Sequence, residues 1–152
     1  MDPTATLRSE RVLPHPPEAV AAAFADPLRL AAWWGPAGFT NTFEVFEFRP
    51  GGAWVFVMHG PDGQYYPNRC EFQVTDADRI VIRHSVAPLF TLTVRLQAVA
   101  GGTRLDWQQA FDDPAVAASL RAFCEPANEQ NLDRLAAVLS VPPAGSPAPQ
   151  AA

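Results

Sequence analysis

The side chains best suited to chemistry in this 152-residue chain are three histidines and two cysteines, and their spacing excludes most common sites. His15, His59 and His84 are far apart and no C-x-x-C motif is present, so we expect no metal site. Ser85 follows His84 in an expected strand, where neighbouring side chains face opposite ways, and no G-x-S-x-G motif occurs. Phosphate and dinucleotide loops are also absent from the sequence. We therefore expect neither a serine triad nor a cofactor.

General acid–base chemistry or ligand orientation stays open for a few polar residues. His84 shares the parity of Ile80 and Ile82, and Gln109 shares that of Trp107 and Phe111. Tyr66 and Asn68 share the parity of Cys70 and Phe72 in the strand before. If these strand faces line a hollow, the polar side chains would project into it. The alternative for each is an ordinary buried or rim residue.

Composition and charge narrow the classes of partner. The formal net charge is −5 and the pI is near 5.0, and all eleven basic residues are Arg. The absence of Lys excludes a Schiff-base lysine, and the absence of a basic stripe argues against nucleic acid. We expect no membrane span, because no stretch approaches 18 apolar residues, and no apolar signal core precedes the domain. Two lone cysteines fit a cytoplasmic protein.

The elements that position these residues follow from periodicity. The segment from Thr6 predicts a strand that ends at Pro14, and Pro17 and Pro27 each begin a short helix. A period of two then predicts six strands joined by glycine- and proline-rich turns, at 40–48, 53–59, 69–75, 79–85, 89–97 and 103–111. A long helix follows from Pro114, and Pro126 should kink or divide it. We expect one α+β domain over residues 1–140 and a disordered Pro/Ala-rich tail over 141–152.

A curved sheet of about seven strands cannot be filled by a single helix, so we expect a cavity between the sheet and the C-terminal helix. The side chains expected to form its walls are large and apolar: Trp54, Phe56, Met58, Phe72, Trp107, Phe111 and Leu120. The alternative is that they are plain core. Tyr66, His84 and Gln109 are expected to orient a ligand.

Several short motifs in this order resemble a known family. They are Arg11-Val12, Pro17-Glu18-Ala19-Val20, Trp33-Trp34-Gly35-Pro36, Phe48-Arg49-Pro50-Gly51-Gly52-Ala53-Trp54, Met58-His59-Gly60-Pro61-Asp62-Gly63, Tyr66-Pro67-Asn68-Arg69, Gly101-Gly102-Thr103-Arg104-Leu105 and Leu132-Asp133-Arg134-Leu135. Over roughly residues 6–140 the chain resembles the helix-grip superfamily (SRPBCC, START-like). Within it, the chain is similar to bacterial single-domain proteins named after the C-terminal domain of the heat-shock-90 ATPase activator.

The resemblance implies a helix-grip fold and binding of a small hydrophobic or aromatic molecule, with no assigned catalysis. A cofactor-independent cyclase or aromatase would use the same cavity, with His84 or Tyr66 as acid or base. A chaperone-related interaction module would instead need a filled core and an exposed patch. An exposed stripe of Val55 and Val57 on the convex face would favour a partner surface or a homodimer. All of these functional hypotheses rest on analogy of fold, and one fold can host unrelated functions.

Overall fold

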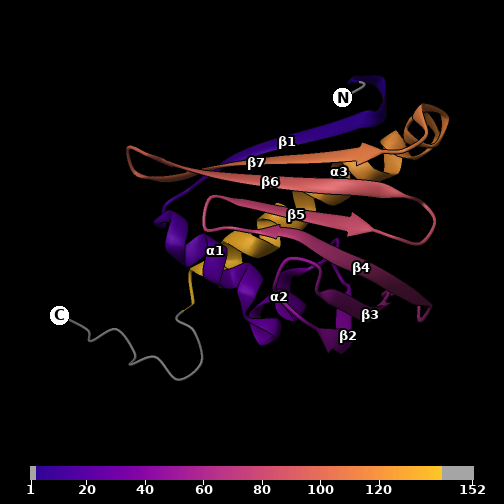
Figure 1. Ribbon diagram of the computed structural model, residues 1–152, viewed down its shortest axis with the longest axis horizontal. Coiled ribbons are helices and arrows are strands. Elements are labelled where there is room, and N and C mark those ends of the chain that lie inside the picture. The colour runs from indigo at the N-terminus through magenta and orange to yellow at the C-terminus, as the bar shows by residue number, and fades with distance from the viewer. Residues whose placement is uncertain (1–2, 142–152) are drawn as a thin grey trace.

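The segments with a period of two form one antiparallel sheet in a computed structural model, which describes residues 3–141. The elements in chain order are η1 (Pro3–Ala5), β1 (Thr6–Leu13), α1 (Pro17–Ala25), α2 (Pro27–Trp33), β2 (Thr40–Phe46), β3 (Ala53–His59), β4 (Tyr65–Thr75), β5 (Arg79–His84), β6 (Phe90–Val99), β7 (Gly102–Phe111) and α3 (Pro114–Leu139). Figure 1 shows the strands as one twisted layer with α3 behind it. The expected α+β class and the expected order of elements along the chain are confirmed.

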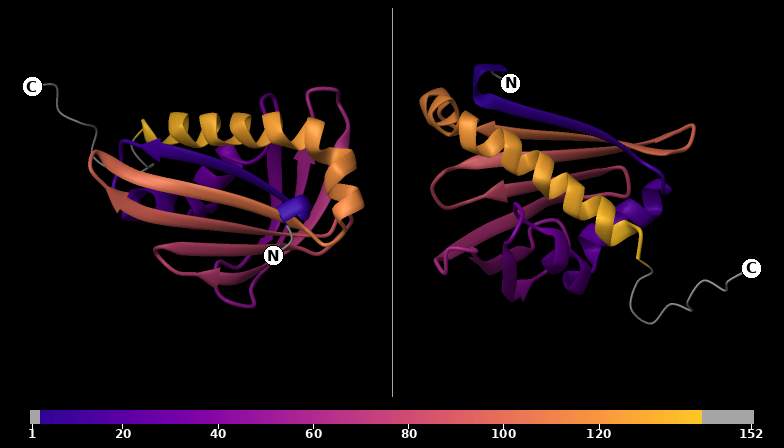
Figure 2. Two further views of the ribbon diagram at one scale, coloured as in Figure 1. Left: turned by 90° about the horizontal axis from the view of Figure 1, so that it is seen from above. Right: turned by 180° about the vertical axis from the view of Figure 1, so that it is seen from behind.

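The sheet is a meander to which the N-terminal strand is added at one edge. Its order is β1-β7-β6-β5-β4-β3-β2, and β1 pairs antiparallel with β7. Register shifts between Phe43 and Val45, and between Phe72 and Val74, interrupt two ladders, and such irregularities increase local bending. The curved sheet wraps around α3, which crosses its concave face (Figure 2). This is the helix-grip arrangement.

The helices begin where their capping residues predict. The Asp26 side chain accepts a hydrogen bond from the Leu28 amide at the start of α2, and Asp113 accepts one from the Ala115 amide at the start of α3. Pro126 lies inside α3 but does not divide it, so that alternative is wrong. The first turns of α3 are bent relative to the rest of the helix (Figure 2). The bend lies on the N-terminal side of Pro126, which lacks the N–H needed for one helical hydrogen bond.

One half of the concave face is filled by aromatic side chains. Helices α1 and α2 cover this half, and Trp33 is fully buried there with its indole N–H donating to the Ala23 carbonyl at 3.0 Å. Trp54 stacks on Phe56 with ring centroids 4.2 Å apart and lies parallel to Phe72 at 5.6 Å. Burial of rings of this size contributes strongly to the core.

Two further expectations concern the chain as a whole. Within residues 3–141, no helix combines the length and the hydrophobicity that a membrane crossing requires. The Pro/Ala-rich tail expected at 141–152 lies outside the described residues, apart from Val141.

Candidate functional site

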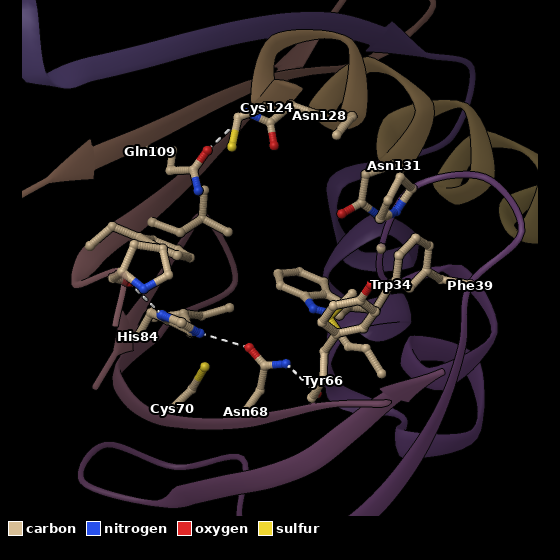
Figure 3. Close-up of a pocket in the computed structure, with 18 of the residues that line it drawn as sticks. Trp34, Phe39, Tyr66, Asn68, Cys70, His84, Gln109, Cys124, Asn128 and Asn131 are labelled. Atoms are coloured by element: carbon tan, nitrogen blue, oxygen red, sulfur yellow. Dashed lines mark hydrogen bonds between the residues drawn. The ribbon is translucent and has the colours of Figure 1, made fainter. Parts of the chain in front are cut away.

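A cavity of about 490 Å³ lies between the other half of the sheet and helix α3 (Figure 3). Strands β3 to β7 form its floor, the segment between α2 and β2 forms one side, and α3 covers it from Phe123 to Asn131. The cavity opens to solvent beside the exposed rings of Tyr65 and Phe123. Its size fits a small organic molecule.

The structure brings seven of the ten expected site residues together in this cavity. Their alternation along each strand places them on the concave face, as the period of two predicts. They are Phe56, Met58, Tyr66, His84, Trp107, Gln109 and Phe111. The geometry of the lining thus follows the strand parity.

The other three expected wall residues are not among the lining residues. Trp54 and Phe72 face the concave side, but they lie in the aromatic-filled half and are fully buried. Leu120 packs near the start of α3 against a small separate cluster that includes Leu7 and Phe111. Parity predicts the face on which a strand residue lies, but not which half of that face the short helices fill.

Tyr66 lies at the mouth of the cavity, where the residue is 42% exposed. Its hydroxyl donates to Asp62 Oδ2 at 2.9 Å, in the turn between β3 and β4. This hydrogen bond is the main reason why the pKa of Tyr66 is raised above its ordinary value. The Tyr66 hydroxyl is thus already hydrogen-bonded to Asp62 at the rim of the cavity, which weakens the expectation that this hydroxyl orients a ligand.

His84 lies on the cavity floor with both ring nitrogens in contact with oxygen atoms. Nδ1 is 2.7 Å from the Pro88 carbonyl oxygen, and Nε2 is 2.7 Å from Asn68 Oδ1. The ring stacks on Phe90 with a centroid separation of 4.5 Å. Burial lowers the pKa of His84, while the hydrogen bond to Pro88 acts in the opposite direction. Asn68 is thus a second polar member of the floor, on the face that its parity indicates.

The lid carries polar groups that the strand pattern did not reveal. Asn128 Nδ2 donates to Gln109 Oε1 at 3.0 Å, which joins α3 to β7 across the cavity. Asn131 Nδ2 donates to the Trp33 carbonyl at 2.8 Å, and Figure 3 shows its oxygen directed into the cavity. The signal in the sequence was the helical spacing of Cys124, Asn128 and Asn131 on one face of α3.

No Asp, Glu, Arg or Lys side chain is among the residues that line the cavity. The two thiols in it, Cys70 and Cys124, are free, and burial raises the pKa of Cys70 to about 12 and that of Cys124 above its ordinary value. Residues 3–141 contain no group of three His, Cys, Asp or Glu side chains that could hold a metal ion. The interior therefore offers apolar contact and a few neutral hydrogen-bonding groups.

A guanidinium from α3 holds the side of the cavity formed by the segment between α2 and β2. Arg134 Nη1 donates to the carbonyls of Trp34, Gly35 and Pro36, and Nη2 to those of Ala32 and Phe39, at 2.8–3.0 Å. Trp34, Gly35, Pro36 and Phe39 all line the cavity. Arg134 thus positions this side without entering the cavity itself.

Comparison with models of known protein families identifies one family. The model of the family described as "Activator of Hsp90 ATPase homolog 1-like protein" matches residues 14–140. No curated protein matches the sequence.

Solved bacterial structures share the fold along nearly their whole length. A protein from Chromobacterium violaceum is 30% identical with a TM-score of 0.78, over 88% of this chain and 96% of the other. A protein from Nitrosomonas europaea is 24% identical with a TM-score of 0.82, over 92% and 97% of the two chains. An AHSA1 protein from Silicibacter pomeroyi is 26% identical with a TM-score of 0.74, over 90% and 98%.

Proposed function

This chain belongs to the family of activator of Hsp90 ATPase homolog 1-like proteins, and we propose that it binds a small hydrophobic or aromatic molecule in the cavity under α3. The observation that carries this proposal is the cavity itself. It measures about 490 Å³ and opens to solvent, and its walls are mostly apolar and aromatic. Among the described residues that line the cavity, His84 is the one whose side chain can carry a positive charge, and none is Asp, Glu, Arg or Lys. Ligand sites typically combine such walls with a few placed polar groups.

The walls favour a flat, apolar ligand. The rings of Trp34 and Trp107 lie 5.8 Å apart and both line the cavity, as do Phe56 and Met58. Aromatic faces and a thioether provide contact area that adapts to the shape of a ligand. The Gln109–Asn128 pair and Asn131 provide hydrogen-bonding groups at the lid. The seven lining residues predicted from the sequence are therefore proposed as ligand contacts.

The contacts of His84 favour binding over acid–base catalysis. A catalytic acid or base must reach the proton that it transfers. Both nitrogens of His84 are already engaged by Pro88 and Asn68, and the Tyr66 hydroxyl is engaged by Asp62. A cyclase or aromatase would need one of these groups to be free.

The test is the thermal stability of the purified protein against a panel of fatty acids, aromatic polyketides and neutral aromatic compounds. Native mass spectrometry on the same sample detects a ligand that co-purifies. A ligand at 100 times its Kd stabilises the fold by about 2.7 kcal/mol. For a chain of this size, that raises Tm by about 5–10 °C.

A pair of matched variants on α3 tests the location. Ala127 lines the cavity, so Ala127→Phe should fill part of it and abolish the shift in Tm. Ala137 is exposed on the same helix and is not a lining residue, so Ala137→Phe should retain the shift. The proposal fails if no compound binds and none co-purifies, or if both variants bind as the parent does.

A further inference from the structure

His84 is held between two groups that both accept hydrogen bonds. The Pro88 carbonyl oxygen can only accept, so Nδ1 must carry a proton and donate to it. Asn68 Nδ2 donates to the Tyr66 carbonyl at 2.8 Å, which fixes the orientation of this amide. Its oxygen, also only an acceptor, therefore faces Nε2 of His84 (Figure 3).

Only the doubly protonated imidazolium can donate to both oxygens at once, because neutral histidine has one N–H and one lone pair. In the neutral ring, one lone pair would face an oxygen at 2.7 Å. The imidazolium removes this repulsion, but it places a positive charge in an apolar cavity, which is unfavourable without a counter-charge. Without a counter-charge, the neutral ring keeps the repulsion from one oxygen, and the imidazolium keeps an unbalanced charge.

The surroundings of His84 provide no such counter-charge. From β4, Cys70 and the Tyr66 ring line the same cavity, and α3 contributes Cys124; none of these is a carboxylate. Arg83, the neighbour on β5, points to the other face and forms a two-pronged ion pair with Asp112 at 2.6 and 2.7 Å. The Asp112 charge is therefore already matched outside the cavity.

We propose that the cavity selects apolar or aromatic molecules that carry one weakly acidic group, such as a carboxylic acid, and that a doubly protonated His84 balances the anion. This inference rests on the proposed function. The bound carboxylate would lie beside His84, where the second N–H of Asn68 is available to donate to it. The proton on His84 comes from the solvent when the ligand binds.

The proposal predicts a linkage between binding and pH. A bound anion raises the pKa of His84 relative to the empty protein, where burial lowers it. Affinity for the anion is then highest below the pKa of the empty protein. It falls by up to about tenfold per pH unit as the pH rises from that pKa to the pKa in the complex. A neutral ligand has no such dependence.

The experiment compares 2-naphthylacetate with its neutral isostere 2-naphthylacetamide. Tryptophan fluorescence gives Kd between pH 5.5 and 8.5, where a free carboxyl group, with its pKa near 4, stays ionised. Calorimetry in buffers of different ionisation enthalpy counts the protons taken up. We expect the acid to bind at least about tenfold more tightly than the amide at the low end of this pH range. It should take up as much as one proton, whereas the amide takes up none.

Two variants separate the charge on His84 from the shape of the cavity. His84→Phe keeps a ring against Phe90 but carries no proton, and Asn68→Asp supplies a permanent carboxylate beside Nε2. Both should lose the preference for the acid over the amide, so that the ratio of the two Kd values falls to about one whatever the affinity for either probe. The comparison of the two probes on the parent protein does not depend on the folding of either variant.

The outcomes distinguish this inference from the proposed function. A preference for the acid, with proton uptake that both variants lose, supports the inference. Equal affinity for both probes without proton uptake overturns the inference and leaves the binding cavity in place. If neither probe binds, the inference fails, and the panel of compounds described above decides the proposed function.

Discussion

Replacing Arg134 by Met should remove the guanidinium that joins the segment between α2 and β2 to α3. Four N–H groups on its two terminal nitrogens are shared among five backbone carbonyls. No carboxylate within residues 3–141 forms an ion pair with it. The methionine keeps most of the apolar contact of the side-chain stem and removes the donors, so the substitution isolates these hydrogen bonds.

The expected loss of stability is about 3 kcal/mol. A hydrogen bond to a charged group contributes about 1.5–3 kcal/mol when it is buried. Arg134 is only partly buried, so several of the carbonyls can be rehydrated in the variant, and the sum of the four N–H contributions is reduced accordingly. For a chain of this length, about 3 kcal/mol lowers Tm by about 6–12 °C.

The assay is urea unfolding followed by circular dichroism, with Arg121→Met as the matched control. Arg121 lies on the same helix and pairs with the exposed Glu125 at 2.8 Å, so its loss should cost only about 0.3–0.5 kcal/mol. If Arg134→Met destabilises the protein no more than Arg121→Met does, the carbonyl cluster does not hold the segment in place, and the reasoning is wrong.

Two other predictions concern the cavity floor and the turn before β3. The Cys70 thiol ionises near 8.5 in the unfolded chain but near 12 when folded. Unfolding titrations should therefore show stability falling as pH rises above about 8.5, and falling more steeply than in Cys70→Ser, which keeps only the contribution of the Cys124 thiol. A Cβ at Gly52 would collide with the Glu47 carbonyl, whereas one at Gly51 meets open space at φ 81°. Thermal melts should show Gly52→Ala more destabilised than Gly51→Ala, whose cost at a positive φ is about 1–2 kcal/mol. Equal costs would contradict the clash.

The strands and their inward faces could be predicted because a period of two is a local property of the sequence. His84, Trp107 and Gln109 alternate with outward-facing neighbours, and each lies on the concave face. The turns were equally local, since glycine at Gly51 and Gly63 permits a positive φ. The fold class and seven of the lining residues follow from such patterns.

The depth of the hollow could not be predicted in this way. Whether Trp54 meets a cavity or a packed core depends on Trp34, which lies between α2 and β2. The ring centroids of these two residues are 4.9 Å apart. The inward face of α3 depends on how the helix is rotated against the sheet, so the helical spacing of Asn128 and Asn131 put them on one face but did not show that this face meets the cavity. The sequence singled out Arg134 only as part of a family motif. Its hydrogen bonds could not be predicted, because their acceptors are backbone carbonyls, which do not depend on residue type.

The concave face of this sheet is divided into a solid aromatic half and a hollow half, and this division bears on how such a domain can diversify. Substitutions around Trp54 disturb rings in contact with several others and put the whole fold at risk. Side chains such as Met58 and Phe123, which border open space, have fewer neighbours to satisfy. Sequence drift can therefore remodel the hollow half while the aromatic half preserves foldability, so one scaffold can change the shape of its cavity without losing its architecture.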